Sequence, residues 1–340
     1  MITARRPAAL AFCALVALAA AWPIVGSAGA SDAPDAQKAA RLVERTRDAA
    51  LHDDFSGEAT VTWTTTSGTQ HARVRVSGAG GAIKIVAANG NTVIDEGRRT
   101  YLRNALGWTG VVVEPTTQHL PEPGGHWNLA TGAASTVAGR PATVVVARRS
   151  NGVPAQRLAV DDDTGLLLAR EVLGPRGEVQ RSVRFSSIDI GSAAISGTID
   201  APSGVRSPTA KALASIPDGY RAPQTLGGYD LITRSRHPDG VLLFYSDGLF
   251  TASVFEQQGD LDWGSLPAGG TDSNVAGTRT RTYHEPSGDV VVWARDGLVY
   301  TCVSDAPSDG FSAMVRPLVA ADRNAPESVV DFVLGPFGWG

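Results

Sequence analysis

The spacing of apolar positions changes near residue 54 from a helical period to an extended one. Small and apolar residues recur three and four positions apart over residues 35–54, which predicts an amphipathic helix. These positions are Ala39, Leu42, Val43, Thr46 and Ala50. From Ala59 onward apolar and polar residues alternate, so we expect antiparallel strands with one apolar and one polar face. Asn89-Gly90 between two such runs is a strong hairpin signal.

Strands and turn-rich segments alternate along the rest of the chain. A first set of strands is predicted over residues 59–63, 72–76, 83–86, 92–95, 100–103, 142–147, 156–160, 166–172 and 179–189. The Pro- and Gly-rich segment 104–138 predicts irregular structure, and residues 191–208 predict a linker. A second set of strands is predicted over residues 241–245, 250–257, 277–284, 290–294 and 298–303. Phe311 to Val319 has helical spacing, and Pro317 should limit its length.

These elements predict an α+β fold, mostly antiparallel β, in two domains. Residues 1–30 form a leader, 31–190 the larger domain, 191–211 the linker, and 212–340 a smaller α+β domain with an apolar tail. The sheet of the larger domain needs a cover for its apolar face. The helix 35–54 and the segment 104–138 are the available covers.

The first thirty residues have the pattern of an export signal. Arg5 and Arg6 precede a nearly unbroken apolar run, and Ala28-Gly29-Ala30 is a cleavage site of the A-x-A type. The sequence therefore predicts an exported, extracytoplasmic protein, either cleaved before Ser31 or tethered to the membrane by an uncleaved N-terminal segment. Cleavage leaves Cys302 as the single cysteine, and we expect it to be a small buried hydrophobe on a strand.

Charge and motif content exclude several classes of function. The chain has 30 Lys and Arg against 34 Asp and Glu, which argues against a nucleic-acid partner. It has no Gly-x-Ser-x-Gly elbow, His-Glu-x-x-His pair, phosphate loop or dinucleotide fingerprint, so we expect neither an enzyme nor a cofactor. No metal site is expected, because Asp161-Asp162-Asp163 lacks the ligand spacing of a calcium loop and His119 and His126 lack further ligands. A Ser-His-Asp triad assembled from distant residues stays open.

The apolar face of the first strands has two interpretations. Its residues form either an ordinary packed core or, where the cover is incomplete, a pocket for a hydrophobic ligand. The candidate ligand-binding residues are Val61, Trp63, Val74, Val76, Ile83 and Ile85.

Two parts of the chain resemble known families. Ala59 to Val76 after a helix, together with Val160-Asp161-Asp162-Asp163-Thr164-Gly165-Leu166-Leu167-Leu168, resembles the LolA/LppX-like lipoprotein-carrier domain. Ile216-Pro217-Asp218-Gly219-Tyr220 and the block Tyr245-Ser246-Asp247-Gly248-Leu249-Phe250-Thr251-Ala252-Ser253-Val254-Phe255-Glu256 resemble the MucB/RseB family of sigma-factor regulatory proteins, in an actinobacterial style. The resemblance implies an N-terminal unclosed β-barrel with covering helices and a smaller C-terminal α+β domain.

The same resemblance implies a function outside the cytoplasmic membrane. Members of this family bind the extracytoplasmic segment of a membrane-spanning anti-sigma factor and shield it from proteolysis, and envelope stress, sensed through lipid or lipoprotein acyl chains, releases them. The resemblance thus implies a non-catalytic regulator of envelope-stress signalling. Two alternatives stay open, a lipid or lipoprotein carrier of the cell envelope and an exported hydrolase.

Candidate partner-binding residues lie in the second domain. Ser246-Asp247-Gly248 is either a plain hairpin turn or, with neighbouring aromatics, part of a peptide-binding surface. The aromatic candidates are Phe244, Tyr245 and Phe250, expected at an exposed edge. Arg234 and Arg236 form a small basic cluster that either meets an acidic partner segment or belongs to a solvated loop.

Overall fold

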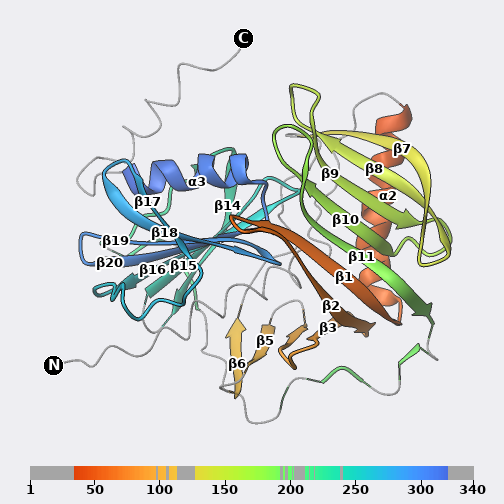
Figure 1. The fold of residues 1–340 in the computed structure, drawn as a ribbon, viewed down its shortest axis with the longest axis horizontal. Coiled ribbons are helices and arrows are strands. Elements are labelled where there is room, and N and C mark those ends of the chain that lie inside the picture. Colours follow the sequence, from red (N-terminus) through yellow and green to blue (C-terminus); the bar gives the residue numbers. More distant parts are fainter. Residues whose placement is uncertain are drawn as a thin grey trace.

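Two antiparallel sheets, each accompanied by one helix, make up the described part of the chain (Figure 1). The computed structural model describes residues 34–96, 99–104, 107–112, 127–191, 194–195, 198–200, 202, 211–213, 215–217, 219–237 and 240–320. The predicted leader, the pair His119 and His126, and the apolar tail lie outside these residues. Helix–sheet packing of this kind confirms an α+β fold dominated by antiparallel strands, whereas the domain boundaries stay predictions.

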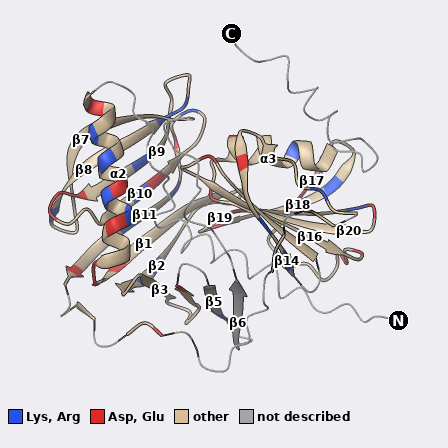
Figure 2. Cartoon of the chain, turned by 180° about the vertical axis from the view of Figure 1, so that it is seen from behind, with Lys and Arg blue, Asp and Glu red and all other residues tan. Residues whose placement is uncertain are grey.

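The predicted N-terminal helix is confirmed as α2 (Pro34–His52). Its apolar stripe faces the sheet, and Val43 is fully buried, while charged residues line the outer face (Figure 2). Asp35 in the first turn accepts hydrogen bonds from the backbone N–H and the hydroxyl of Thr131. The helix is thus fixed both by its buried stripe and by the hydrogen bonds between Asp35 and strand β7.

The first sheet has eleven strands in the order β6-β5-β4-β3-β2-β1-β11-β10-β9-β8-β7. The strands are β1 (Phe55–Thr65), β2 (Gly68–Ala79), β3 (Ala82–Ala87), β4 (Thr92–Asp95), β5 (Arg99–Asn104), β6 (Gly107–Val112), β7 (Asn128–Val137), β8 (Arg140–Arg148), β9 (Pro154–Asp161), β10 (Leu167–Leu173) and β11 (Val179–Ile190). Helix α2 contacts β7, β8, β9 and also β2, so the sheet curves around it. Among the described residues no pairing joins the edges β6 and β7, and the sheet is open.

The second sheet has the strand order β12-β14-β15-β16-β20-β19-β18-β17, with β13 paired to β14. The strands are β12 (Lys211–Ala212), β13 (Thr225–Leu226), β14 (Tyr229–His237), β15 (Gly240–Ser246), β16 (Thr251–Gln258), β17 (Thr271–Val275), β18 (Thr278–Glu285), β19 (Gly288–Arg295) and β20 (Leu298–Ser304). Helix α3 (Ser308–Ala320) packs on one face of this sheet. Cys302 is fully buried on β20, as expected.

One sequence prediction is wrong and another is confirmed. The segment 104–138 contains strands β6 and β7 rather than only irregular structure. Strand β7 consists mainly of small residues and lacks a strong strand pattern, but it pairs along most of its length with the Val-rich β8, and this pairing decides its conformation. The helix expected over Phe311 to Val319 is confirmed as α3, which continues three residues past Pro317. Its apolar residues, among them Phe311 and Met314, are buried against the sheet.

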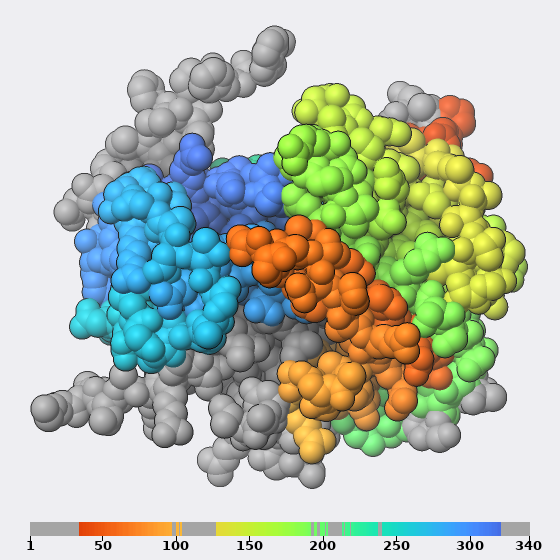
Figure 3. All heavy atoms as spheres, viewed as in Figure 1, coloured from red at the N-terminus to blue at the C-terminus, as the bar shows by residue number. Residues whose placement is uncertain are grey.

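The two sheets share apolar contacts. One hydrophobic cluster contains Val43 of α2 and Val145 of β8 together with Tyr245, Phe250 and Trp293 of the second sheet. Figure 3 shows the β1–β2 hairpin lying against the second sheet, and β1 contacts β18. The segments on either side of the predicted linker therefore form a common interface.

None of the helices in the described ranges combines the length and the apolar character that a membrane-spanning helix requires.

Candidate binding site at the junction of the two sheets

Two arginines of the first sheet reach carboxylates of the second sheet and of the segment directly after it. Arg181 of β11, only 7% exposed, donates to Asp289 Oδ1 at 3.1 Å. Its guanidinium also donates to the carbonyl oxygens of Asp305, at 3.1 Å, and of Ala306. Arg170 of β10 pairs with Asp305 at 2.6 Å. Since every one of these carboxylates is nearly inaccessible to water, the contacts fix the relative position of the sheets.

Aromatic rings extend this ionic contact. The Arg170 guanidinium lies 5.7 Å from the centroid of the Phe250 ring, and Trp127, just before β7, packs edge-on against the same ring at 5.4 Å. Phe250 is fully buried. The loop that connects β15 to β16 is thus anchored to the first sheet by a cation–π contact and an aromatic pair.

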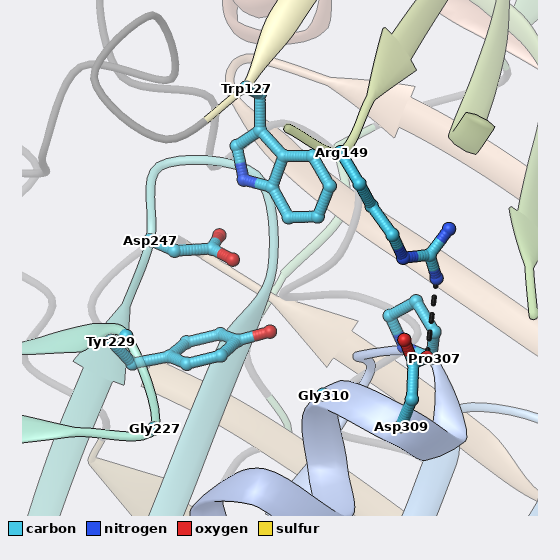
Figure 4. A pocket seen from close by; sticks show the side chains of 9 residues that line it. Trp127, Arg149, Gly227, Tyr229, Asp247, Pro307, Asp309 and Gly310 are labelled. Atoms are coloured by element: carbon cyan, nitrogen blue, oxygen red, sulfur yellow. Dashed lines mark hydrogen bonds and ion pairs between the residues drawn. The ribbon is translucent and has the colours of Figure 1, made fainter. Parts of the chain in front are cut away.

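A pocket of about 220 Å³ opens beside this loop, between the two sheets (Figure 4). Its lining comes from five separate segments: Trp127, Arg149, Gly227, Gly228, Tyr229, Asp247, Pro307, Asp309 and Gly310. In Figure 4 the Asp247 carboxylate lies between the Trp127 indole and the Tyr229 ring. Arg149 lies on the opposite side, where it pairs with Asp309 at 3.2 Å.

Asp247 is held by its own loop. Its Oδ1 accepts hydrogen bonds from the backbone N–H groups of Leu249, at 2.9 Å, and Phe250, at 2.8 Å. The Ser246 hydroxyl donates to the carbonyl of Phe250 and accepts from the N–H of Gly248, which has a positive φ of 85°. The Ser-Asp-Gly sequence therefore suits this loop. The side chains of Ser246 and Asp247 close the loop by hydrogen bonds, and Gly248 tolerates the left-handed backbone conformation.

Burial perturbs the acid–base behaviour of the pocket. Asp247 is 4% exposed, and loss of solvation raises its pKa to about 6, against the opposing effect of the two backbone N–H donors. The Trp127 indole faces the carboxylate and also lowers this pKa, although its Nε1 has no direct hydrogen-bond partner among the described residues. Tyr229 has a pKa well above its ordinary value, first through burial and then through the charge of Asp247.

Comparisons with known proteins give matches at the level of solved structures. No family model matches the chain, and no curated protein is similar to it. The chain is similar to MucB of the Pseudomonas aeruginosa MucA/MucB complex, with 19% identity over 82% of this chain and 96% of that chain and a TM-score of 0.49. It is also similar to a crystal structure of MucB (18% identity, 82% of this chain and 96% of that chain covered, TM-score 0.49).

A weaker likeness connects it to a LolA superfamily protein from Nitrosomonas europaea, with 9% identity, 80% of this chain and 92% of that chain covered, and a TM-score of 0.22. At these identities and TM-scores the matches assign the chain to no family.

The predicted partner-binding residues are distributed over two places. Phe244, Tyr245 and Phe250 are at most 3% exposed, so the expectation of aromatics at an exposed edge is wrong. Tyr245 and Phe250 belong to the shared core. Phe244 lies on strand β15, which is buried along its whole length between β14 and β16. Asp247, in contrast, lines the pocket.

Arg234 and Arg236 lie toward the far end of β14 from the pocket. Arg234 is half-buried and Arg236 is exposed. They are five and seven residues from Tyr229, or about 17 to 23 Å along a strand. The structure therefore does not bring this basic pair to the pocket, and its partner-binding role stays a prediction.

The six hydrophobic-ligand candidates lie in one cluster on the inner face of the first sheet. Five of them are at most 8% exposed, and Trp63 is partly buried: Val61, Trp63, Val74, Val76, Ile83 and Ile85. They pack with Phe55 and Phe185 and with Ala49 and Ala50 of α2. This packing favours the interpretation as an ordinary core, and binding of a hydrophobic ligand stays a prediction.

Sequence reasoning missed most of the pocket. Trp127, Arg149, Tyr229 and Asp309 come from segments that are 22 to 80 residues apart in the chain and carry no motif. Only Asp247 lies in a block that the sequence singled out. Its neighbours in space follow from the docking of two sheets, which periodicity does not predict.

Proposed function

We propose that the chain is an exported, non-catalytic regulator that binds the extracytoplasmic segment of a membrane-spanning anti-sigma factor. The observation that carries the proposal is the pocket at the junction, which contains Asp247 from the block that resembles the MucB/RseB family. A binding role fits a site whose polar groups are fixed by structural hydrogen bonds rather than arranged around a nucleophile.

Residues directly after the first stretch that carries this resemblance, Ile216 to Tyr220, contact the second stretch, Tyr245 to Glu256. The hydroxyl of Tyr245 donates to the carbonyl of Pro223 at 3.0 Å, and the N–H of Arg221 donates to Glu256 at 3.1 Å. Ile216 and Tyr220 pack against the shared core. The segment that begins with Ile216 and the block that begins with Tyr245 therefore build one structural unit next to the pocket.

The resemblance also supports two statements about how the regulator acts. Binding shields the anti-sigma segment from proteolysis, and lipid or lipoprotein acyl chains reverse the binding under envelope stress. A role as a lipid or lipoprotein carrier is the alternative, and it requires the cluster around Val61 and Ile85 to open into a cavity. The close packing of that cluster against α2 makes the regulator the better-supported function.

Isothermal titration calorimetry tests the proposal. Residues 31–340 are titrated with the purified extracytoplasmic segment of an anti-sigma factor from the same organism, and a segment of scrambled sequence is the control. We expect saturable 1:1 binding by the native segment only, and slower proteolysis of the bound segment. Equal heats from native and scrambled segments would exclude the regulator. Native mass spectrometry showing copurified lipid without such binding would favour the carrier.

A further inference from the structure

The carboxylate of Asp247 is buried without a counter-ion. The three junction arginines are paired elsewhere, Arg149 with Asp309, Arg170 with Asp305 and Arg181 with Asp289. Among the residues that the structure describes, no Lys, Arg or His forms an ion pair with Asp247, and the main causes of its pKa shift are burial, its hydrogen bonds and the charge of Asp305. A charge removed from water is costly unless it is paired, so this arrangement is incomplete by itself.

The pocket places open space next to this carboxylate. The Asp247 carboxylate lies between the rings of Trp127 and Tyr229 (Figure 4). Gly228 and Gly310 also line the pocket and add no side chains to it. The volume of about 220 Å³ is below the roughly 300–1,000 Å³ of pockets that hold drug-sized ligands. The space therefore suits one side chain or a comparably small molecule.

The charges around the pocket determine whether it favours a positively or a negatively charged ligand. The groups that face Asp247 from the surrounding elements are Trp127, Arg149, Tyr229, Asp305 and Asp309. Arg149 is held by Asp309 and by the carbonyl oxygens of Pro154, at 2.7 Å, and Leu173, at 2.9 Å. With Asp305 neutralised by Arg170, the pocket keeps one negative charge, which is that of Asp247.

Its aromatic walls distinguish an organic cation from a metal ion. Indole and phenol rings attract ammonium and guanidinium groups through their faces, but they offer few ligands to a hard metal ion. No group of three or more His, Cys, Asp or Glu residues that could hold a metal occurs in the described part of the chain.

We propose that this pocket binds the guanidinium or ammonium group of an Arg or Lys side chain in a partner segment, with Asp247 as counter-ion and Trp127 and Tyr229 as aromatic walls. The inference rests on the proposed function for the origin of the segment, and on the pocket alone for its chemistry. A cation at this position completes the charge pairing of the junction.

The probe is N-acetyl-arginine methylamide, followed through the indole N–H resonance of Trp127 in ¹H–¹⁵N spectra. The Trp127→Phe variant assigns the resonance. N-acetyl-citrulline methylamide, which has nearly the same shape but no charge, is the matched control ligand. We expect a saturable shift with arginine and none with citrulline, and weaker binding as the pH falls below about 6, where Asp247 becomes protonated.

Two variants and one control establish the site. Asp247→Asn keeps the Oδ1 acceptor for the loop and removes the charge, and should weaken arginine binding at least tenfold. Gly310→Leu places a side chain in the pocket from a helical position and should abolish the shift. Asp262→Asn changes an exposed aspartate that accepts the Gly264 N–H in a similar turn, and should leave binding unchanged.

The pocket assignment is overturned if citrulline binds as well as arginine, if Asp247→Asn leaves the affinity unchanged, or if CaCl₂ shifts the resonance and arginine does not. Failure here is distinguishable from failure of the proposed function. Binding of the anti-sigma segment without arginine binding overturns the pocket assignment alone, whereas arginine binding without segment binding overturns the regulator alone.

Discussion

The buried guanidinium of Arg181 provides a quantitative test of how the two sheets are held together. The substitution Arg181→Met keeps the apolar part of the side chain and removes contacts to Asp289, to the Asp305 carbonyl and to the Ala306 carbonyl. Because Asp289 is 3% exposed, it then becomes a buried carboxylate, and His284 is its one remaining ion-pair partner in the described part of the chain. Breaking a buried pair in this way costs about 3–5 kcal/mol of the free energy of unfolding.

His284, the remaining partner of Asp289, makes the loss of stability in Arg181→Met depend on pH. His284 Nδ1 lies 2.9 Å from the same Oδ1 of Asp289, and this contact raises the pKa of His284. When His284 is protonated it can neutralise Asp289 in place of Arg181. The destabilisation by Arg181→Met should therefore be smaller at pH 5.5 than at pH 8.

Urea denaturation followed by tryptophan fluorescence measures both effects. Arg176→Met is the matched control, because Arg176 is 87% exposed and lies 4.0 Å from Glu178, where a surface pair contributes about 0–1 kcal/mol. If Arg181→Met costs no more than the control, the junction does not depend on this arginine. If it costs the same at both pH values, His284 does not replace Arg181 as the partner of Asp289.

Three further predictions concern the surroundings of the junction and the core. Because the pKa of His284 is raised in the folded state, the wild type should be more stable than His284→Gln below about pH 6.5. This difference in stability should disappear as the pH rises through the folded-state pKa of His284. Urea denaturation at several pH values measures it, and a parallel pH dependence of the two proteins would contradict the prediction. Gly57→Ala should destabilise the fold by about 1–3 kcal/mol because a Cβ there would lie 2.2 Å from the Ser187 carbonyl oxygen, whereas Gly264→Ala, with no contact closer than 3.4 Å, should be neutral by thermal melting. Cys302 should react with a thiol reagent only after unfolding, and rapid labelling of the native protein would show that β20 is accessible.

The secondary structure followed from sequence wherever periodicity was strong. Helix α2, the hairpin at Asn89-Gly90 and the strands around Val76 and Val145 are visible as local patterns, and the structure confirms them. Strand β7 escaped prediction because its residues are small and its conformation depends on pairing with β8. Helix α3 passes Pro317 because tertiary packing outweighs the local preference.

Of the residues that line the candidate site, the sequence pointed only to Asp247. The turn Ser246-Asp247-Gly248 could be recognised as a loop with a special backbone, but its aromatic neighbours were expected at the surface and are buried. Trp127 and Arg149 reach the pocket through docking of one sheet against the other. These contacts join residues that are 120 positions apart (Trp127 and Asp247) or 160 positions apart (Arg149 and Asp309), and no local signal in a single sequence records them.

The central claim is that this chain binds an extracytoplasmic anti-sigma segment at the junction of its two sheets. The most direct test is calorimetric titration of residues 31–340, wild type and Asp247→Asn, with that segment, and with Asp262→Asn as the control protein. We predict saturable 1:1 binding that Asp247→Asn weakens and Asp262→Asn does not. Absence of binding to the wild type would contradict the function, and equal binding by wild type and Asp247→Asn would contradict its location.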